Sequence, residues 1–303
     1  MRYFGSNIKL MVNNLVVSYT DQGPEEAPVI IFIHGFPLNK TMWDNQVDAL
    51  KEDYRVVSYD IRGHGDSEPG NEDFSIKLFV ADLLHLMDAL KIEKASLCGL
   101  SMGGYIALNA IENFPERFDA LVLSDTNCIA DSPKAKQKRL TTIESIREFG
   151  VEKYVDDSIV HLFAPESFMT HKNEISEVKE MILNTSEQSL SKTLMALSQR
   201  KATCGKLPEI TIPVLFLVGE EDEITPPEAS ELMHQKIKNS TIHIIPQAGH
   251  LSNLENPVEF NKQLKIFFAK VYKKHETEQA DGSTSAFSQI RHKLNMLLTF
   301  SSI

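Results

Sequence analysis

Ser101 lies in the pentapeptide GLSMG, residues 99–103, whose spacing is typical of an activated nucleophile. The apolar run Ala95 to Cys98 precedes it, and the helix-forming segment Tyr105 to Asn113 follows it. A sharp turn from strand to helix forces the serine into strained backbone geometry, in which only glycine fits at the flanking positions. Because such a turn lifts the hydroxyl clear of the sheet, we expect Ser101 to act as a nucleophile.

A serine hydroxyl is a weak nucleophile until a base takes its proton and a third group orients that base. His250 is the predicted base, because it follows the apolar run Thr241 to Ile245 and sites gather at the carboxyl ends of strands in open α/β sheets. Asp222 is the predicted acid, because it follows the preceding run, Val214 to Val218. The resulting order of serine, acid and histidine is the order that this type of turn requires.

Other carboxyl groups are candidates for the acid. Asp125 follows another apolar run, Ala120 to Ser124, and an acid at that place can also reach the base. Three glutamates also lie beside Asp222, namely Glu220, Glu221 and Glu223. These alternatives stay open on the sequence alone.

Acyl transfer also needs N–H donors for the negative oxygen of the tetrahedral intermediate, and each donor typically contributes about 2.7 to 4 kcal/mol. The backbone amide of Met102, at the start of the helix after the serine, is one predicted donor. The amide of Phe36, in the loop after the run Val29 to Ile33, is the other. We expect His34 to brace this loop.

Apolar runs that are typical of strands recur along the chain, and most are separated by segments of helical periodicity. They are Leu15 to Tyr19, Val29 to Ile33, Arg55 to Tyr59, Ala95 to Cys98, Ala120 to Ser124, Val214 to Val218 and Thr241 to Ile245. Continuous apolar strands that alternate with helices indicate a mainly parallel sheet buried on both faces. The predicted fold class is therefore α/β, with a central sheet flanked by helices.

The pattern changes at two places. Residues 127–208 carry helical periodicity without a convincing strand, and we expect a helical lid inserted here after the sixth core strand. Residues 1–126 and 209–274 then form the α/β core. Residues 275–303 are interpreted as a polar linker and an appended C-terminal segment.

The composition of the chain indicates which partners and which cellular compartment to expect. The chain has 303 residues and a formal net charge of −11, which opposes binding to nucleic acid. It has no apolar run long enough to span a bilayer, and its first residues lack the apolar core of a secretory signal. Its cysteines, Cys98, Cys128 and Cys204, are odd in number without a paired framework, which favours a reduced setting. We expect a cytoplasmic monomer or homodimer that needs no metal or organic cofactor.

Five segments together resemble the serine hydrolases of the α/β-hydrolase fold family. They are HGFP at residues 34–37, DIRGHGDS at 60–67, GLSMGG at 99–104, residues 219–226, and AGH at 248–250. The resemblance covers about residues 10–272 and is greatest to 3-oxoadipate enol-lactonase-like hydrolases and small carboxylesterases. In such proteins the second segment is a structural turn, which implies that Asp60 and His64 are not catalytic.

These observations predict a serine hydrolase that cleaves a carboxylic ester or lactone of a small, largely apolar molecule through an acyl-enzyme. Pro37, Trp43 and Tyr105 are expected to border its pocket. An anionic substrate would instead need a cation, and the lid entrance offers Lys134, Lys136, Lys138, Arg139 and Arg147. Two further functions stay open: cofactor-free perhydrolysis of the haloperoxidase type, in which peroxide replaces water, and a ligand receptor that uses the hydrolase fold.

Overall fold

The computed structural model describes residues 5–273, and the chain divides into two compact units, Met1–Gln263 and Leu264–Ile303. The second unit is helical over its described residues, 264–273. The predicted linker and appended segment, 275–303, lie outside the described residues. The first unit contains the sheet, the lid and every residue that the sequence predicts for the site.

The sheet has eight strands in the order β1-β2-β4-β3-β5-β6-β7-β8. They are β1 (Gly5–Val12), β2 (Leu15–Gln22), β3 (Val29–Ile33), β4 (Arg55–Tyr59), β5 (Ala95–Leu100), β6 (Phe118–Ser124), β7 (Val214–Gly219) and β8 (Ser240–Ile245). All pairings from β4 to β8 are parallel, whereas β1 and β2 join antiparallel. The prediction of a mainly parallel sheet is confirmed.

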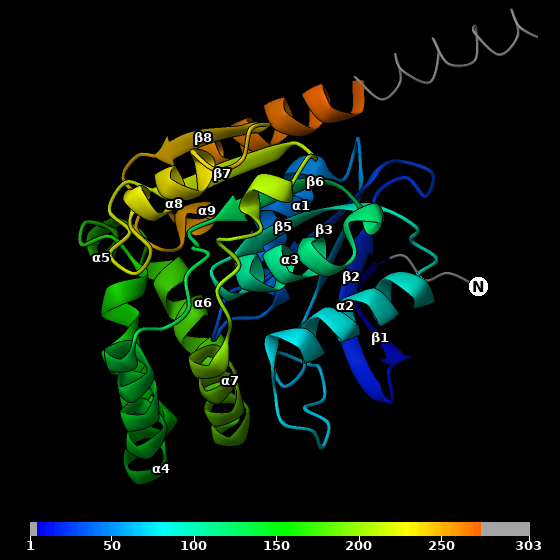
Figure 1. Cartoon of the computed structure of the whole chain (residues 1–303). Helices are drawn as coiled ribbons and strands as arrows, with labels where there is room; N and C mark the ends of the chain where they lie inside the picture. Colours follow the sequence, from blue (N-terminus) through cyan, green and yellow to red (C-terminus); the bar gives the residue numbers. More distant parts are fainter. Residues whose placement is uncertain (1–4, 274–303) are drawn as a thin grey trace, which may run out of the picture. The chain divides into compact units, whose positions relative to one another are not determined.

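Helices pack on the sheet and bury its apolar side chains. Outside the lid they include α1 (Asp44–Leu50), α2 (Ile76–Ala89), α3 (Met102–Asn113), α8 (Pro227–His234) and α9 (Ser252–Glu255). α2 and α3 lie side by side over the sheet (Figure 1). α2 begins where the Ser75 hydroxyl accepts the N–H of Leu78 at 3.1 Å, which satisfies a donor at the helix start. Leu97, Leu121 and Phe216 are fully buried in the core, and each such side chain contributes about 1.5–3 kcal/mol.

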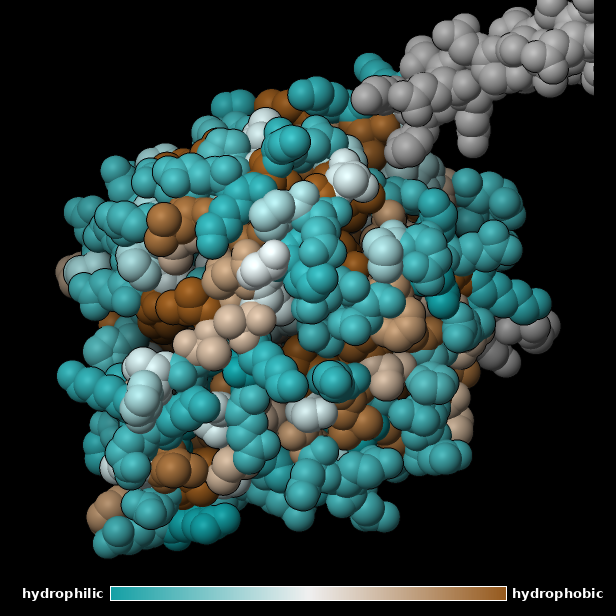
Figure 2. Space-filling model, viewed as in Figure 1, coloured by the Kyte–Doolittle hydropathy of each residue, from teal (hydrophilic) through white to brown (hydrophobic). Residues whose placement is uncertain are grey.

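A helical insertion separates β6 from β7, as predicted. It contains α4 (Pro133–Leu162), α5 (Ser167–Thr170), α6 (Lys172–Leu183) and α7 (Glu187–Gln199). α4 packs against both α6 and α7 (Figure 1). It consists of two helices that meet at Gly150, where φ is 85° and ψ is 175°. The face of the molecule seen in Figure 2 is largely hydrophilic, with apolar residues visible in patches between polar ones.

Cys128 and Cys204 form a disulfide, so the expectation of cysteines without a paired framework is wrong. The two residues lie 76 positions apart, one at each end of the lid, and the return of the chain from the lid brings them together. Beside the disulfide the Thr203 N–H donates to the Cys128 carbonyl at 2.9 Å. Cys98 is free and buried.

The disulfide removes the argument for a reducing compartment, because disulfides persist in oxidising ones. The cytoplasmic location therefore stays a prediction without support from the cysteines. Within residues 5–273, no helix combines the length and the apolar character needed to cross a membrane.

Candidate active site

Ser101 occupies the turn between β5 and α3 with φ 53° and ψ −112°, a conformation that costs free energy for a residue other than glycine. The neighbouring glycines allow this turn. A Cβ at Gly99 would lie 2.4 Å from the carbonyl carbon of Gly103, and one at Gly103 would lie 2.1 Å from the Ile33 oxygen. The turn is held by the Thr126 hydroxyl, which donates to the Ser101 carbonyl at 2.8 Å.

The predicted acid and base meet at the carboxyl ends of β7 and β8. Nδ1 of His250 lies 3.0 Å from Oδ1 and 2.9 Å from Oδ2 of Asp222. Asp222 is itself held by its own loop: Oδ1 accepts the N–H groups of Ile224 and Thr225, and Oδ2 accepts the Thr225 hydroxyl at 2.7 Å. A carboxylate in this place keeps a proton on Nδ1 and leaves Nε2 able to accept one.

Burial and neighbouring charges shift the pKa values of Asp222 and His250. Burial opposes ionisation of Asp222, but the charge and hydrogen bond of His250 and the donors of Thr225 outweigh it and lower the pKa of Asp222. Burial likewise opposes protonation of His250, but Asp222, and then Asp125 and Glu255, raise the pKa of His250 above its ordinary value. The histidine is therefore a stronger base than a free imidazole.

The alternative acids lie elsewhere. Asp125 is fully buried, but Oδ1 accepts the Gly219 N–H at 2.8 Å and Oδ2 accepts the hydroxyls of Ser124 and Ser252. Burial and the charge of Asp222 raise the pKa of Asp125. The three glutamates beside Asp222 are exposed. Asp222 is thus the carboxylate that contacts His250, and Asp125 joins the loops on which both residues stand.

The Ser101 hydroxyl makes no hydrogen bond to His250 in the described part of the chain. In substrate-free enzymes such contacts are often long and tighten only in the Michaelis complex. The N–H groups of Phe36 and Met102 have no hydrogen-bond partner within residues 5–273, so both are available to an incoming oxygen. His34 braces the Phe36 loop, because its Nε2 accepts the Ile61 N–H at 2.9 Å.

The residues expected around the pocket divide into two groups. Phe36 and Tyr105 are half-buried and contact lid side chains, Tyr154 at 6.4 Å between ring centroids and the Arg200 guanidinium at 4.3 Å respectively. Pro37 is buried beside Phe36. Trp43, in contrast, is fully buried in the core, where its ring lies 4.8 Å from that of Phe32.

Sequence reasoning missed an ion cluster at the base of the lid. Asp131 binds Nε of Arg139 at 2.5 Å and also pairs with Arg200, whose guanidinium covers the Tyr105 ring. Tyr105 follows Ser101 by one helical turn. The sequence offers Arg139 only as one of several cations, because its contact with Asp131 depends on the tertiary structure of the lid.

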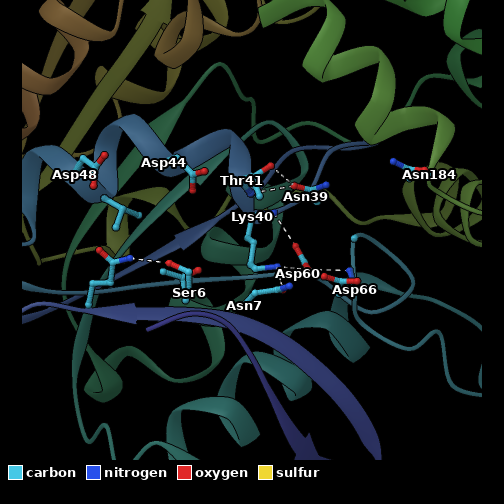
Figure 3. Close-up of a pocket in the computed structure, with 14 residues that line it drawn as sticks. Ser6, Asn7, Asn39, Lys40, Thr41, Asp44, Asp48, Asp60, Asp66 and Asn184 are labelled. Atoms are coloured by element: carbon cyan, nitrogen blue, oxygen red, sulfur yellow. Dashed lines mark hydrogen bonds and ion pairs between the residues drawn. The ribbon is translucent and has the colours of Figure 1, made fainter. Parts of the chain in front are cut away.

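A polar cavity of about 700 Å³ lies apart from these residues (Figure 3). Its lining includes Lys40 and Asp60 but none of Ser101, Asp222 and His250. The Lys40 ammonium is bound by Asp60 at 2.8 Å and by the Ser18 hydroxyl at 2.9 Å. Asp60 also accepts the N–H groups of Lys40 and Asp66, so it organises the turn at residues 60–67.

His64, the histidine of that turn, is fully buried, and burial lowers its pKa to about 4. Its Nδ1 donates to the Arg62 carbonyl at 3.1 Å. Among residues 5–273, no group of three or more histidine, cysteine, aspartate or glutamate side chains is placed to hold a metal ion.

A serine on a strained strand–turn–helix, with an acid and a histidine paired at the ends of two later strands of the same sheet, is the architecture of the α/β hydrolases. Residues 28–257 match the family described as alpha/beta hydrolase fold. The chain therefore belongs to the alpha/beta hydrolase fold family.

Similar proteins include enzymes that act on esters and lactones. The chain is 32% identical to 3-oxoadipate enol-lactonase 1 of Acinetobacter baylyi over 238 residues, which cover 78% of this chain and 87% of the relative. It is 31% identical to a putative non-heme chloroperoxidase of Synechocystis over 272 residues, covering 83% and 94%. A solved thermophilic esterase from Thermogutta terrifontis is 31% identical, with a TM-score of 0.83, covering 87% of this chain and 98% of that one.

Proposed function

We propose that this alpha/beta hydrolase cleaves a carboxylic ester or lactone of a small, largely apolar substrate through a serine acyl-enzyme. The observation that carries the proposal is the strained Ser101 at the end of β5 together with the Asp222–His250 pair at the ends of β7 and β8. Parallel strands bring these ends to one edge of the sheet. The similarity to an enol-lactonase and an esterase supports the same reaction class.

In the proposed reaction Oγ of Ser101 attacks the carbonyl carbon and its proton passes to Nε2 of His250. Asp222 stabilises the imidazolium, and the N–H groups of Phe36 and Met102 bind the negative oxygen. The imidazolium then protonates the leaving alkoxide, which departs as an alcohol from an ester and stays on the acyl chain as a hydroxyl group from a lactone. Water attacks the acyl-enzyme by the same route and releases the carboxylic acid and free Ser101.

The half-buried ring of Phe36, which lies 6.4 Å from the ring of Tyr154 in the lid, favours a compact apolar substrate. Arg139 is the cation to test for a substrate that bears a carboxylate. Its Nε is bound to Asp131, and its two terminal nitrogens have no hydrogen-bond partner in the described residues. A cytoplasmic location and a monomeric or homodimeric state stay predictions.

Hydrolysis of a series of short- to medium-chain p-nitrophenyl esters, with an enol-lactone included, tests the proposal. We expect the wild type to turn over at least one of them and Ser101→Ala to lower kcat by about 10⁶-fold. A fluorophosphonate should label the wild type at Ser101 and leave the variant unlabelled. Equal rates of ester hydrolysis in the wild type and in Ser101→Ala would refute the serine mechanism.

Perhydrolysis is the second candidate, favoured by the similarity to the chloroperoxidase. In that reaction hydrogen peroxide replaces water on the same acyl-enzyme and releases a peracid. Product analysis with and without peroxide separates the two, because hydrolysis converts the acyl group to a carboxylic acid and gives no peracid.

A further inference from the structure

Glu255 lies at the end of α9, five residues after the predicted base, and its side chain is buried. Oε1 accepts the N–H of Gly249 at 2.8 Å, directly beside His250. Oε2 accepts the N–H of Ala164 at 2.7 Å and the hydroxyl of Ser167 at 2.6 Å. A single carboxylate therefore holds both the histidine loop and the lid.

The lid also lies directly on the histidine loop at this point. A Cβ at Gly249 would lie 2.6 Å from the Ala164 nitrogen and 2.8 Å from the Phe163 carbonyl carbon, so no side chain fits there. Phe163 and Ala164 are both buried. The segment 163–167 is thus an anchor in the middle of the lid sequence, in addition to the disulfide that joins the ends of the lid.

We propose that Glu255 is a positioning residue that couples the seating of lid segment 163–167 to the position of His250. The inference rests on the proposed function, in which His250 is the base. While the segment is seated, the carboxylate is fixed by donors on both of its oxygens, and it fixes Gly249 in turn. When the segment leaves, Oε2 loses both donors, the carboxylate turns toward water, and the histidine loop loses its restraint. The base is then in place only under a closed lid.

The charge of Glu255 gives the proposal a second observable. Three carboxyl groups face His250: Asp222 in direct contact, Asp125 and Glu255. Burial raises the pKa of Glu255, and the hydrogen bonds from the Ser167 side chain and from the backbone of Ala164, Gly249 and Leu251 oppose this rise. Two of those donors belong to the lid, so a seated lid favours the charged carboxylate, which in turn favours protonation of His250.

The test compares Ser167→Ala, Glu255→Gln and the double variant. Thr170→Ala is the matched control, because its hydroxyl is exposed on the same helix, α5, and donates to the Glu166 carbonyl. Hydrogen–deuterium exchange is measured for segments 163–168 and 248–254 in the full chain without substrate. We expect Ser167→Ala to speed exchange in both segments, and Thr170→Ala to leave segment 248–254 unchanged.

Kinetics on p-nitrophenyl esters give the second readout. We expect Ser167→Ala to lower kcat about tenfold, the loss that corresponds to one hydrogen bond to a charged group. Its acid limb of kcat/KM should stay in place, because no charge is removed. Glu255→Gln should lower kcat further and move the acid limb of kcat/KM to lower pH. The double variant should have the same kcat as Glu255→Gln alone.

The coupling would be overturned if Ser167→Ala changed exchange in segment 163–168 but not in segment 248–254. It would also be overturned if the losses in kcat of the two single variants added in the double variant. An unmoved acid limb in Glu255→Gln would also count against it. Because exchange is read without substrate, an absence of ester hydrolysis in the wild type would sink the proposed function alone and leave the coupling to be decided by exchange.

Discussion

Replacing Asp222 by asparagine removes one negative charge and turns Oδ2, the acceptor nearest Nδ1 of His250, into an N–H donor. In Asp222→Asn the side-chain oxygen can keep the N–H groups of Ile224 and Thr225, now bound at 2.9 and 3.0 Å, and the new amide can donate to the Thr225 hydroxyl. What disappears is the carboxylate at 2.9–3.0 Å from Nδ1 of His250. Because Asp222 is only 2% exposed, dissolved salt screens this charge little.

Two effects should follow in kinetics. The same change in a serine protease triad lowers kcat about 10⁴-fold, which corresponds to about 5.4 kcal/mol of transition-state stabilisation, and we expect that size here. The acid limb of kcat/KM should also move to lower pH. Asp222 is the main group that raises the pKa of His250, and without it burial dominates, so the imidazole stays neutral at lower pH.

The measurement is the pH dependence of kcat and kcat/KM for a p-nitrophenyl ester, at low and high salt. Asp125→Asn is the matched control, since it changes a fully buried carboxyl group that does not contact His250. Its acid limb should move in the same direction by less, with a loss in kcat below tenfold. The reasoning is refuted if Asp125→Asn costs as much as Asp222→Asn, or if the acid limb of Asp222→Asn does not move.

Three further changes test the framework around the site. Gly103→Ala should lower the free energy of unfolding by about 1–3 kcal/mol or more in urea titrations, because its Cβ would lie 2.1 Å from the Ile33 oxygen. Gly205→Ala, whose Cβ meets nothing within 4 Å, should not. Arg200→Met breaks the pair with Asp131, which keeps its contact with Arg139, and should cost about 1.5–3 kcal/mol in thermal unfolding; an unchanged melting temperature would contradict the assignment. Dithiothreitol should lower stability by about 4 kcal/mol by opening the disulfide across 76 residues, and a variant with both Cys128 and Cys204 replaced by serine should not respond.

Much of the core could be predicted because each inner strand is a continuous apolar run ending in a glycine-rich or polar loop. β1 was missed because its side chains are mostly exposed or half-buried, so it lacks such a run. A signal was present. Asn13 and Asn14 both take positive φ, 49° and 61°, in the turn that joins β1 to β2, and paired asparagines between two strands favour a hairpin.

The roles of the buried acids could not be separated from the sequence. Asp125 and Asp222 both follow a parallel strand, and the difference is that Asp222 turns toward His250 while Asp125 accepts the Gly219 N–H. That choice depends on loop geometry. Glu255 gave no signal either, because its partners at Ala164 and Ser167 lie about ninety residues earlier and meet it only through the lid. The disulfide was not predicted either, because its two cysteines also lie far apart in the sequence and meet only through the fold of the lid.

The disulfide also joins the two ends of the lid next to the sheet. The Cα atoms of Cys128 and Cys204 lie 4.9 Å apart, and beyond them β6 and β7 pair directly as neighbours in the sheet. The two points at which the insertion leaves and rejoins the core therefore lie side by side. An insertion of different length could replace this one if its two ends were equally close. Contacts such as those of Arg200 with Tyr105 and of Ser167 with Glu255 are what a transplanted lid would have to supply anew. Replacement of one contiguous stretch of sequence can thus change the surroundings of the proposed site while the sheet stays as it is.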